Sequence, residues 1–223
     1  MLTWAGESST IFSQSFPVLL TAFIVTPVPW IANALLVNQP GGYDQMGLYS
    51  AAFRWYAVLV FVPSTILQPL LPVLSGELAK GDYGMVVRVL KKTCFLSVCV
   101  VAPFAMVLCL ASPIVMGWYG KGFETGWLTL CVVALTAVVY TLHMNIYQYI
   151  FAEGRLWLVF GIQMLWSTTY LLVVYLMRSY GSLTLACANF SAYVLSDALA
   201  FLCLLRIVHR RSSEIDAQGA TSV

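Results

Sequence analysis

Charged residues are scarce in this chain. Only 9% of its 223 residues are charged, against about 25% in an average soluble domain. Hydrophobic residues make up 61%, and the mean hydropathy is +0.86. This balance excludes an ordinary soluble domain, and a net charge of +2 gives no reason to expect nucleic-acid binding. The sequence therefore predicts an integral membrane protein.

Catalytic and cofactor motifs are also missing. The chain has no DDxxD-type carboxylate cluster, HExxH, GxSxG, Walker A or Rossmann glycine pattern. Its six cysteines follow no metal-binding spacing and lie in apolar runs, so we expect reduced packing residues: Cys94, Cys99, Cys109, Cys131, Cys187 and Cys203. We therefore expect no enzyme, no catalytic residue, no metal and no cofactor. Without an ATP site, active transport would draw on an ion gradient, the membrane potential or metabolic removal of product.

Six apolar stretches of 20 residues or more are present. Each is long enough to cross a bilayer as a helix, and the ten-residue alternation of an outer-membrane barrel is absent. The sequence thus predicts an all-α, polytopic helical bundle over residues 1–205, followed by a basic, disordered tail at 206–223. The expected spans are 12–37, 47–74, 93–116, 126–150, 156–177 and 182–205.

The distribution of lysine and arginine predicts the orientation. With six spans both termini lie on one side, and the loops and tail on that side carry eight basic residues: Lys80, Arg88, Lys91, Lys92, Arg155, Arg206, Arg210 and Arg211. The opposite loops carry only Lys121 and Arg178. The positive-inside rule then places both termini in the cytoplasm. The N-terminal segment has neither a basic n-region nor a small-residue cleavage site, so we expect no cleaved signal peptide.

The stretch 47–77 combines a polar stripe with three prolines. At about 100° per residue its polar positions share one helical face with Phe61: Ser50, Arg54, Thr65 and Gln68. Such a stripe is costly in lipid, so we expect it to face other helices or a wet cavity. Arg54 has two interpretations, a cavity-lining cation or a side chain that reaches the membrane interface. Pro63, Pro69 and Pro72 predict a kinked or broken helix.

The fourth span carries the chain's densest group of polar and aromatic residues. Tyr140, His143 and Tyr147 share one face, and Asn145 and Gln148 lie on another with Thr141. His143 is either a hydrogen-bonded packing residue, part of a path lined for sugars or headgroups, or a proton-coupling group.

The sixth span aligns Asn189, Tyr193 and Ser196, with Asp197 at the edge of this stripe. An unpaired aspartate in the bilayer costs about 2.5–3.5 kcal/mol, so we expect Asp197 to pair, to be protonated or to meet water. A structural hydrogen bond and a cavity or ion-coupling role both remain open. Gln163 in the fifth span is expected to serve packing.

Two further segments have alternative interpretations. The first span contains TPVPWIAN, in which Asn33 shares a face with Thr26 and Trp30; this is either a kinked packing helix or part of a substrate path. The segment 83–92 is predicted to be an amphipathic interfacial helix or else a gating linker. In the interfacial helix Met85, Val86, Val89 and Leu90 would face lipid, and Arg88, Lys91 and Lys92 would face anionic headgroups.

Three segments resemble a known family. GLYSAAFRWYAVLVFVPSTILQPLLPVLS resembles the seventh-to-eighth helix region of polysaccharide (O-antigen type) flippases. AEGRLWLVF and RSYGSLTLACANF are similar to that family's turns before its eleventh and twelfth helices, with Leu183 or Thr184 where the family often has glycine. The resemblance implies the multidrug/oligosaccharidyl-lipid/polysaccharide exporter superfamily, whose members have two six-helix lobes around a central cavity.

The resemblance covers one lobe, the C-terminal one, of this MATE-like architecture. It implies an inner-membrane flippase lobe for a polyprenyl-pyrophosphate-linked oligosaccharide, with membrane lipids and a second six-helix lobe as partners. Arg54 would attract the pyrophosphate. The other cavity candidates come from the stripes: Asn33, Gln68, His143, Asn145, Gln148, Asn189 and Asp197. The alternatives are a cation-coupled drug exporter of the same superfamily and a non-transporting assembly subunit or truncated remnant.

Overall fold

The computed structural model describes residues 4–221, with side chains from 15 to 204, and this part of the chain is helical with no strand. Its α-helices are α1 Trp4–Val25, α2 Pro27–Val37, α3 Gly42–Leu67, α4 Leu70–Lys80, α5 Tyr83–Leu110, α6 Ser112–Gly117, α7 Trp127–Ala152, α8 Leu156–Leu176 and α9 Ser182–Thr221. Six segments are long and apolar enough to cross a membrane. The predicted all-α bundle with six spans is confirmed.

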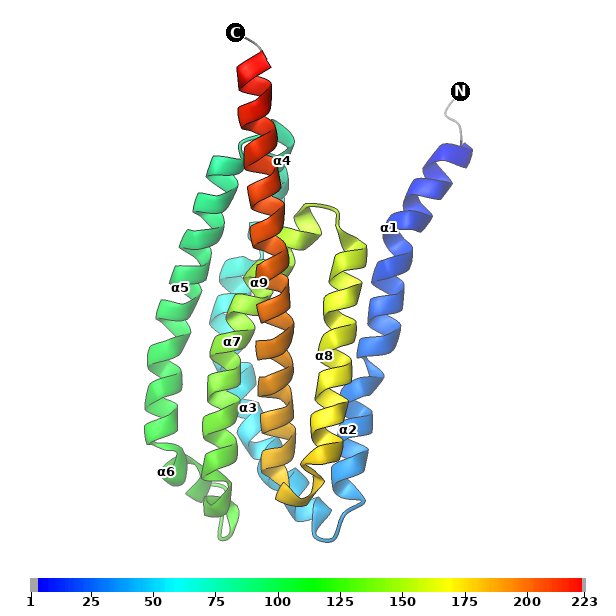
Figure 1. The fold of residues 1–223 in the computed structure, drawn as a ribbon. Coiled ribbons are helices and arrows are strands. Elements are labelled where there is room, and N and C mark those ends of the chain that lie inside the picture. The colour runs from blue at the N-terminus through cyan, green and yellow to red at the C-terminus, as the bar shows by residue number, and fades with distance from the viewer. Residues whose placement is uncertain (1–3, 222–223) are drawn as a thin grey trace.

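Helices α1 and α9 have their outer ends at the same end of the bundle (Figure 1). This arrangement is the one that six spans require, and the assignment of that end to the cytoplasm stays a prediction. The backbone of α9 is helical to Thr221, whereas the sequence predicted disorder from Arg206 onward. Side chains beyond Leu204, including the three arginines of the tail, lie outside the described residues.

Prolines divide the first two spans. The first is interrupted at Thr26, where Pro27 and Pro29 begin α2. The second is interrupted at Gln68 and Pro69, between α3 and α4, while Pro63 lies inside α3 without ending it. The missing amide hydrogen of proline removes a helical hydrogen bond at each joint. The predicted break in the second span is therefore present, at its second proline.

The third span begins ten residues earlier than predicted. Helix α5 runs without interruption from Tyr83, and the carboxylate of Asp82 caps its start by accepting a hydrogen bond from the Met85 amide at 2.8 Å. Val86 and Leu90 are buried against Leu67, Leu70 and Leu74. The predicted separate interfacial helix with these two residues toward lipid is wrong, because Val86 and Leu90 cover the α3–α4 joint instead.

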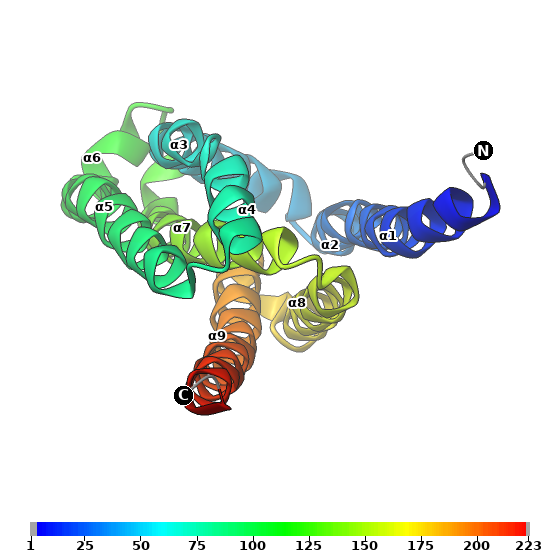
Figure 2. The same ribbon diagram turned by 90° about the horizontal axis from the view of Figure 1, so that it is seen from above.

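Helix α7 lies at the centre of the bundle and packs against α3, α5 and α9 (Figure 2). Small residues are fully buried on two of these helices, Ala134 and Ala137 on α7 and Ala188 and Ala192 on α9. Small side chains allow helix backbones to approach closely, which is how membrane helices gain packing energy. The central position of α7 brings its polar residues against several neighbouring helices.

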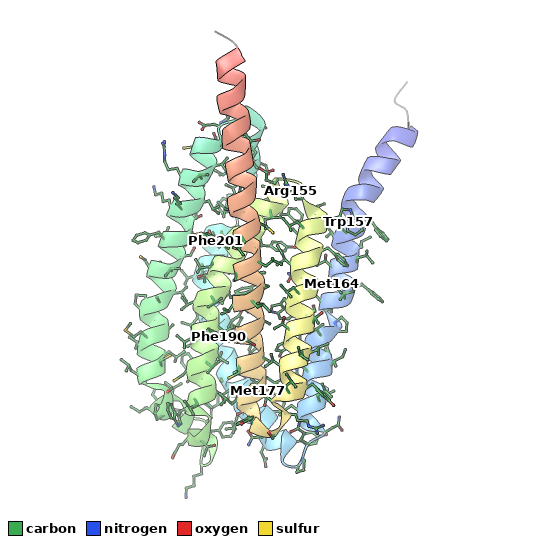
Figure 3. All side chains as sticks on the ribbon, viewed as in Figure 1. Arg155, Trp157, Met164, Met177, Phe190 and Phe201 are labelled. Carbon is green, nitrogen blue, oxygen red and sulfur yellow. The ribbon has the colours of Figure 1, made fainter. Side chains whose placement is uncertain are left out.

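The first span lies at the edge of the bundle. Helix α1 packs mainly against α8, and Figure 2 shows it extending away from the other helices. Near one end of this pair the rings of Phe16 and Trp157 have centroids 6.3 Å apart; Trp157 is labelled in Figure 3. Side chains such as Phe23 and Trp30 are largely exposed, which suits contact with lipid or with another membrane segment.

Candidate functional site

A pocket of about 370 Å³ lies between α1, α7, α8 and α9. This volume falls in the range of small-molecule sites, about 300–1,000 Å³. Three tyrosines, a histidine and two glutamines contribute to its wall, which is formed by Val25, Tyr140, His143, Met144, Tyr147, Gln148, Gln163 and Tyr193. The wall thus combines aromatic faces with uncharged hydrogen-bonding groups.

A buried acid–base pair lies at this pocket. His143 Nδ1 on α7 is 2.6 Å from Asp197 Oδ1 on α9, and both side chains are buried. The second oxygen, Asp197 Oδ2, is buried without a hydrogen-bond partner among the described residues. The sequence predicted that Asp197 would pair or be protonated, and the structure supplies His143 as its partner.

Aromatic rings surround His143. Its ring centroid is 5.2 Å from that of Tyr193 and 6.0 Å from those of Tyr140 and Tyr147. Tyr140 in turn lies 5.6 Å from Tyr56 on α3, also between ring centroids. The predicted face of Tyr140, His143 and Tyr147 is therefore one wall of the pocket, and aromatic contacts connect it to α3.

Arg54 lies at the middle of α3, twelve residues after Gly42 and thirteen before Leu67. At 1.5 Å per residue this is about 18 Å from the start of the helix, against a hydrocarbon core of about 30 Å. Its side chain is exposed. Both interpretations of Arg54, the cavity-lining cation and the side chain that reaches the interface, therefore stay predictions.

The stripe predicted on this span is the exposed side of α3. Arg54, Phe61, Thr65 and Gln68 are exposed and Ser50 is half-buried. The opposite side carries the buried residues Leu48, Tyr49 and Ala52. The polar stripe and the buried side of α3 are therefore on opposite faces, and the described part of the chain leaves the stripe uncovered.

The other candidate residues are dispersed. Asn145 is fully buried and donates its amide hydrogens to Thr141 O at 2.7 Å and to Ser97 Oγ on α5 at 3.4 Å, so it faces away from the pocket. Gln148 lines the pocket. Asn33 on α2 and Asn189 on α9 are half-buried, and Asn189 Oδ1 has no partner among the described residues.

Sequence reasoning missed the contribution of the fifth span. Gln163, expected to serve packing, lines the pocket together with Val25 of α1 and Met144 of α7. Periodicity places residues on faces of one helix, and it does not say which faces of different helices meet. The sequence did contain a signal for the His143–Asp197 pair. His143 is the single basic residue well inside the fourth span, and Asp197 is the single acidic residue well inside the sixth.

The described residues contain no group of three or more histidine, cysteine, aspartate or glutamate side chains that could hold a metal ion. At the pocket, aromatic faces can stack on a ligand, and amides and hydroxyls can hydrogen-bond to it.

Two curated proteins are similar to this chain. One is the EPS I polysaccharide export inner membrane protein EpsE of Ralstonia nicotianae (strain ATCC BAA-1114 / GMI1000), 26% identical over 193 residues, covering 86% of this chain and 44% of that protein. The protein of the same name from Ralstonia solanacearum is 24% identical over 182 residues, covering 81% and 42%. The chain thus spans less than half the length of these relatives.

No family model matches the chain, and no solved structure matches it. The names of the two relatives agree with the polysaccharide-export part of the resemblance drawn from the three sequence segments.

Proposed function

We propose that this chain is one lobe of an inner-membrane flippase that moves a polyprenyl-pyrophosphate-linked oligosaccharide across the membrane for surface polysaccharide. Two observations support the general class: both relatives are named as polysaccharide export inner membrane proteins, and the chain has six membrane-length helices. Since it spans under half of those relatives, the proposal includes a second six-helix lobe, in the same polypeptide or in another.

The exposed Arg54 at the middle of α3 carries this proposal. A charged side chain at bilayer depth is costly unless it meets an opposite charge or water. A guanidinium forms paired hydrogen bonds with phosphate oxygens, which suits the pyrophosphate of the lipid carrier. The polar stripe around Arg54 would then line the cavity between the two lobes.

The pocket beside His143 supports the sugar part of the proposal. Carbohydrates present apolar C–H faces and many hydroxyl groups, so they suit a wall of tyrosine rings and glutamine amides. One amphipathic substrate would then bind at two parts of the lobe, with its pyrophosphate near Arg54 and its sugar near α7.

Complementation tests this function. The chain is expressed with a first-lobe partner in cells that lack their own polysaccharide flippase, and surface polysaccharide is measured. We expect restoration with the partner, a loss of at least about tenfold for Arg54→Ala, and partial activity for Arg54→Lys, which keeps the charge but not the paired hydrogen bonds. Arg88→Ala is the matched control, because Arg88 is exposed near the start of α5.

Three outcomes separate the possibilities. Restoration by the chain alone would indicate a self-associating pair of lobes. Full activity of Arg54→Ala would remove the cationic site from the proposal. Failure of the wild-type chain with the partner, at normal membrane expression, would reject the flippase in favour of a non-transporting subunit or remnant.

A cation-coupled drug exporter is the second candidate, and the buried His143–Asp197 pair favours it. An acidic group in the membrane interior is a suitable site for a coupling cation. Drug resistance conferred by the chain with its partner, and lost in Asp197→Asn without any restoration of polysaccharide, would support this candidate over the flippase.

A further inference from the structure

Few of the residues that line the pocket beside His143 can carry a charge. Of the eight residues that line it, His143 is the single one that can carry a positive charge, and none carries a carboxylate. The remaining polar groups are tyrosine hydroxyls and the amides of Gln148 and Gln163. Asp197, which does not line the pocket, is hydrogen-bonded to the far side of the imidazole.

This arrangement cancels the charge of the histidine. An isolated charge is expensive at this depth, whereas a pair that holds one carboxylate and one extra proton has no net charge. The titratable groups around His143 are Tyr140, Tyr147 and Tyr193, together with Asp197. Three neutral phenols and one compensated pair therefore leave the pocket without net charge.

We infer that the pocket selects an uncharged sugar residue, and that Asp197 sets this selectivity by neutralising His143. The inference rests on the proposed function and names the sugar class that this site takes. A neutral pyranose can stack on the tyrosine rings and hydrogen-bond to both glutamines. A sugar acid would have to bury its carboxylate in a pocket without net charge, and an uncompensated buried charge is costly in a medium of low dielectric constant.

The site of selectivity is separate from the site of the phosphate. Arg54 on α3 does not line this pocket, so the negative charge of a lipid pyrophosphate and the neutral sugar would be recognised by different residues. Asp197 thus acts as a positioning and charge-setting residue through His143, without touching the sugar itself.

The experiment compares two ligands that differ at one carbon. The purified chain in lipid nanodiscs is titrated with short-chain polyprenyl pyrophosphate carrying glucose or glucuronic acid, in which a carboxylate replaces the C6 hydroxymethyl group. The same lipid pyrophosphate without sugar is the third ligand. Titrations are made at about pH 6, where an ordinary imidazole is mostly protonated.

We expect wild type to bind the glucose ligand at least about tenfold more tightly than the glucuronic acid ligand. Asp197→Asn keeps the shape of the side chain but removes its charge, so the imidazole of His143 can pair with the sugar carboxylate instead, and the ratio falls to about one or reverses. The double variant His143→Gln with Asp197→Asn makes the pocket neutral again and restores the preference for glucose. A purely structural role for Asp197 does not predict this recovery.

Glu124→Gln is the matched control, because it removes an exposed carboxylate remote from the pocket, and we expect it to keep the wild-type ratio. An unchanged ratio in Asp197→Asn, or a double variant that fails to regain the preference, overturns the charge selectivity alone. If wild type binds the glucose ligand no better than the sugar-free lipid, the pocket is no sugar site, and both this inference and the sugar part of the proposed function are overturned.

Discussion

Gln45 Oε1 accepts a hydrogen bond from the backbone N–H of Ser182 at 2.8 Å, so a side chain in the first turn of α3 caps the start of α9. The first amide groups of a helix lack partners within the helix, and such a cap supplies one. Gly181 precedes this cap with φ +63°, and a Cβ atom there would overlap the Gln45 side chain. This contact joins residues 137 positions apart in the sequence.

The first prediction concerns this cap. Gln45→Ala should lower the free energy of unfolding by about 1–2 kcal/mol, because it leaves the Ser182 amide without its partner. Gly181→Ala should destabilise the same end through its left-handed φ and the overlap with Gln45. Thermal unfolding in detergent measures both, with the exposed Gln68→Ala as control. Unfolding temperatures equal to wild type for both variants would contradict the capping role.

The second prediction concerns the α7–α9 interface. Ala188→Leu should cost about 1–3 kcal/mol, since Ala188 is fully buried and added methyl groups force the two helices apart. Ala198→Leu on the same helix is exposed and should stay close to wild type. Thermal unfolding of the two variants compares the same substitution on two faces of one helix. Equal losses would contradict the assigned packing face of α9.

The third prediction separates the two members of the buried pair. His143→Gln alone leaves a buried carboxylate without its partner and should cost about 3–5 kcal/mol. Adding Asp197→Asn removes that charge, so the double variant should be more stable than His143→Gln. The measurement is a double-mutant cycle of unfolding free energies. Additive effects would show that the two side chains do not interact.

The fourth prediction tests orientation. In a background without the native cysteines, Lys121→Cys should react with a membrane-impermeant maleimide in intact cells, and Lys80→Cys only after the membrane is opened. Both side chains are exposed and lie at opposite ends of the bundle, in the loops that the positive-inside rule separates. The reverse labelling pattern would invert the predicted topology.

Apolar length predicted most of the architecture. Stretches of 20 or more apolar residues predicted the six spans because a membrane demands that length and allows few other solutions. The beginning of α5 was missed because Arg88, Lys91 and Lys92 gave its first turns a polar character. Those side chains point outward while Val86 and Leu90 pack inward, and hydropathy averaged along the chain merges the two sides.

The site was less predictable, for a geometric reason. Periodicity along α7 correctly grouped Tyr140, His143 and Tyr147, since residues of one helix have a fixed relation. It also offered Asn145, which faces α5 and completes a packing contact with Ser97. Which of these two faces of α7 lines the pocket depends on how α5, α8 and α9 are placed around α7. That placement depends on long-range packing, in which small residues such as Ala134 and Ala192 are buried.

The proline joints lie in the first half of the chain, so the helices of its two halves should differ in how easily they bend. The first two spans are each made of two helical pieces, divided at Thr26 and at Gln68–Pro69, whereas α7, α8 and α9 are unbroken and the sequence contains no proline after Pro113. Bending is cheapest where a backbone hydrogen bond is already absent. We therefore expect α7, α8 and α9 to bend less easily than the helices of the first half of the chain. Val25, next to the joint at Thr26, belongs to the pocket wall, so one wall of the pocket is attached at a joint while His143 and Asp197 lie in unbroken helices.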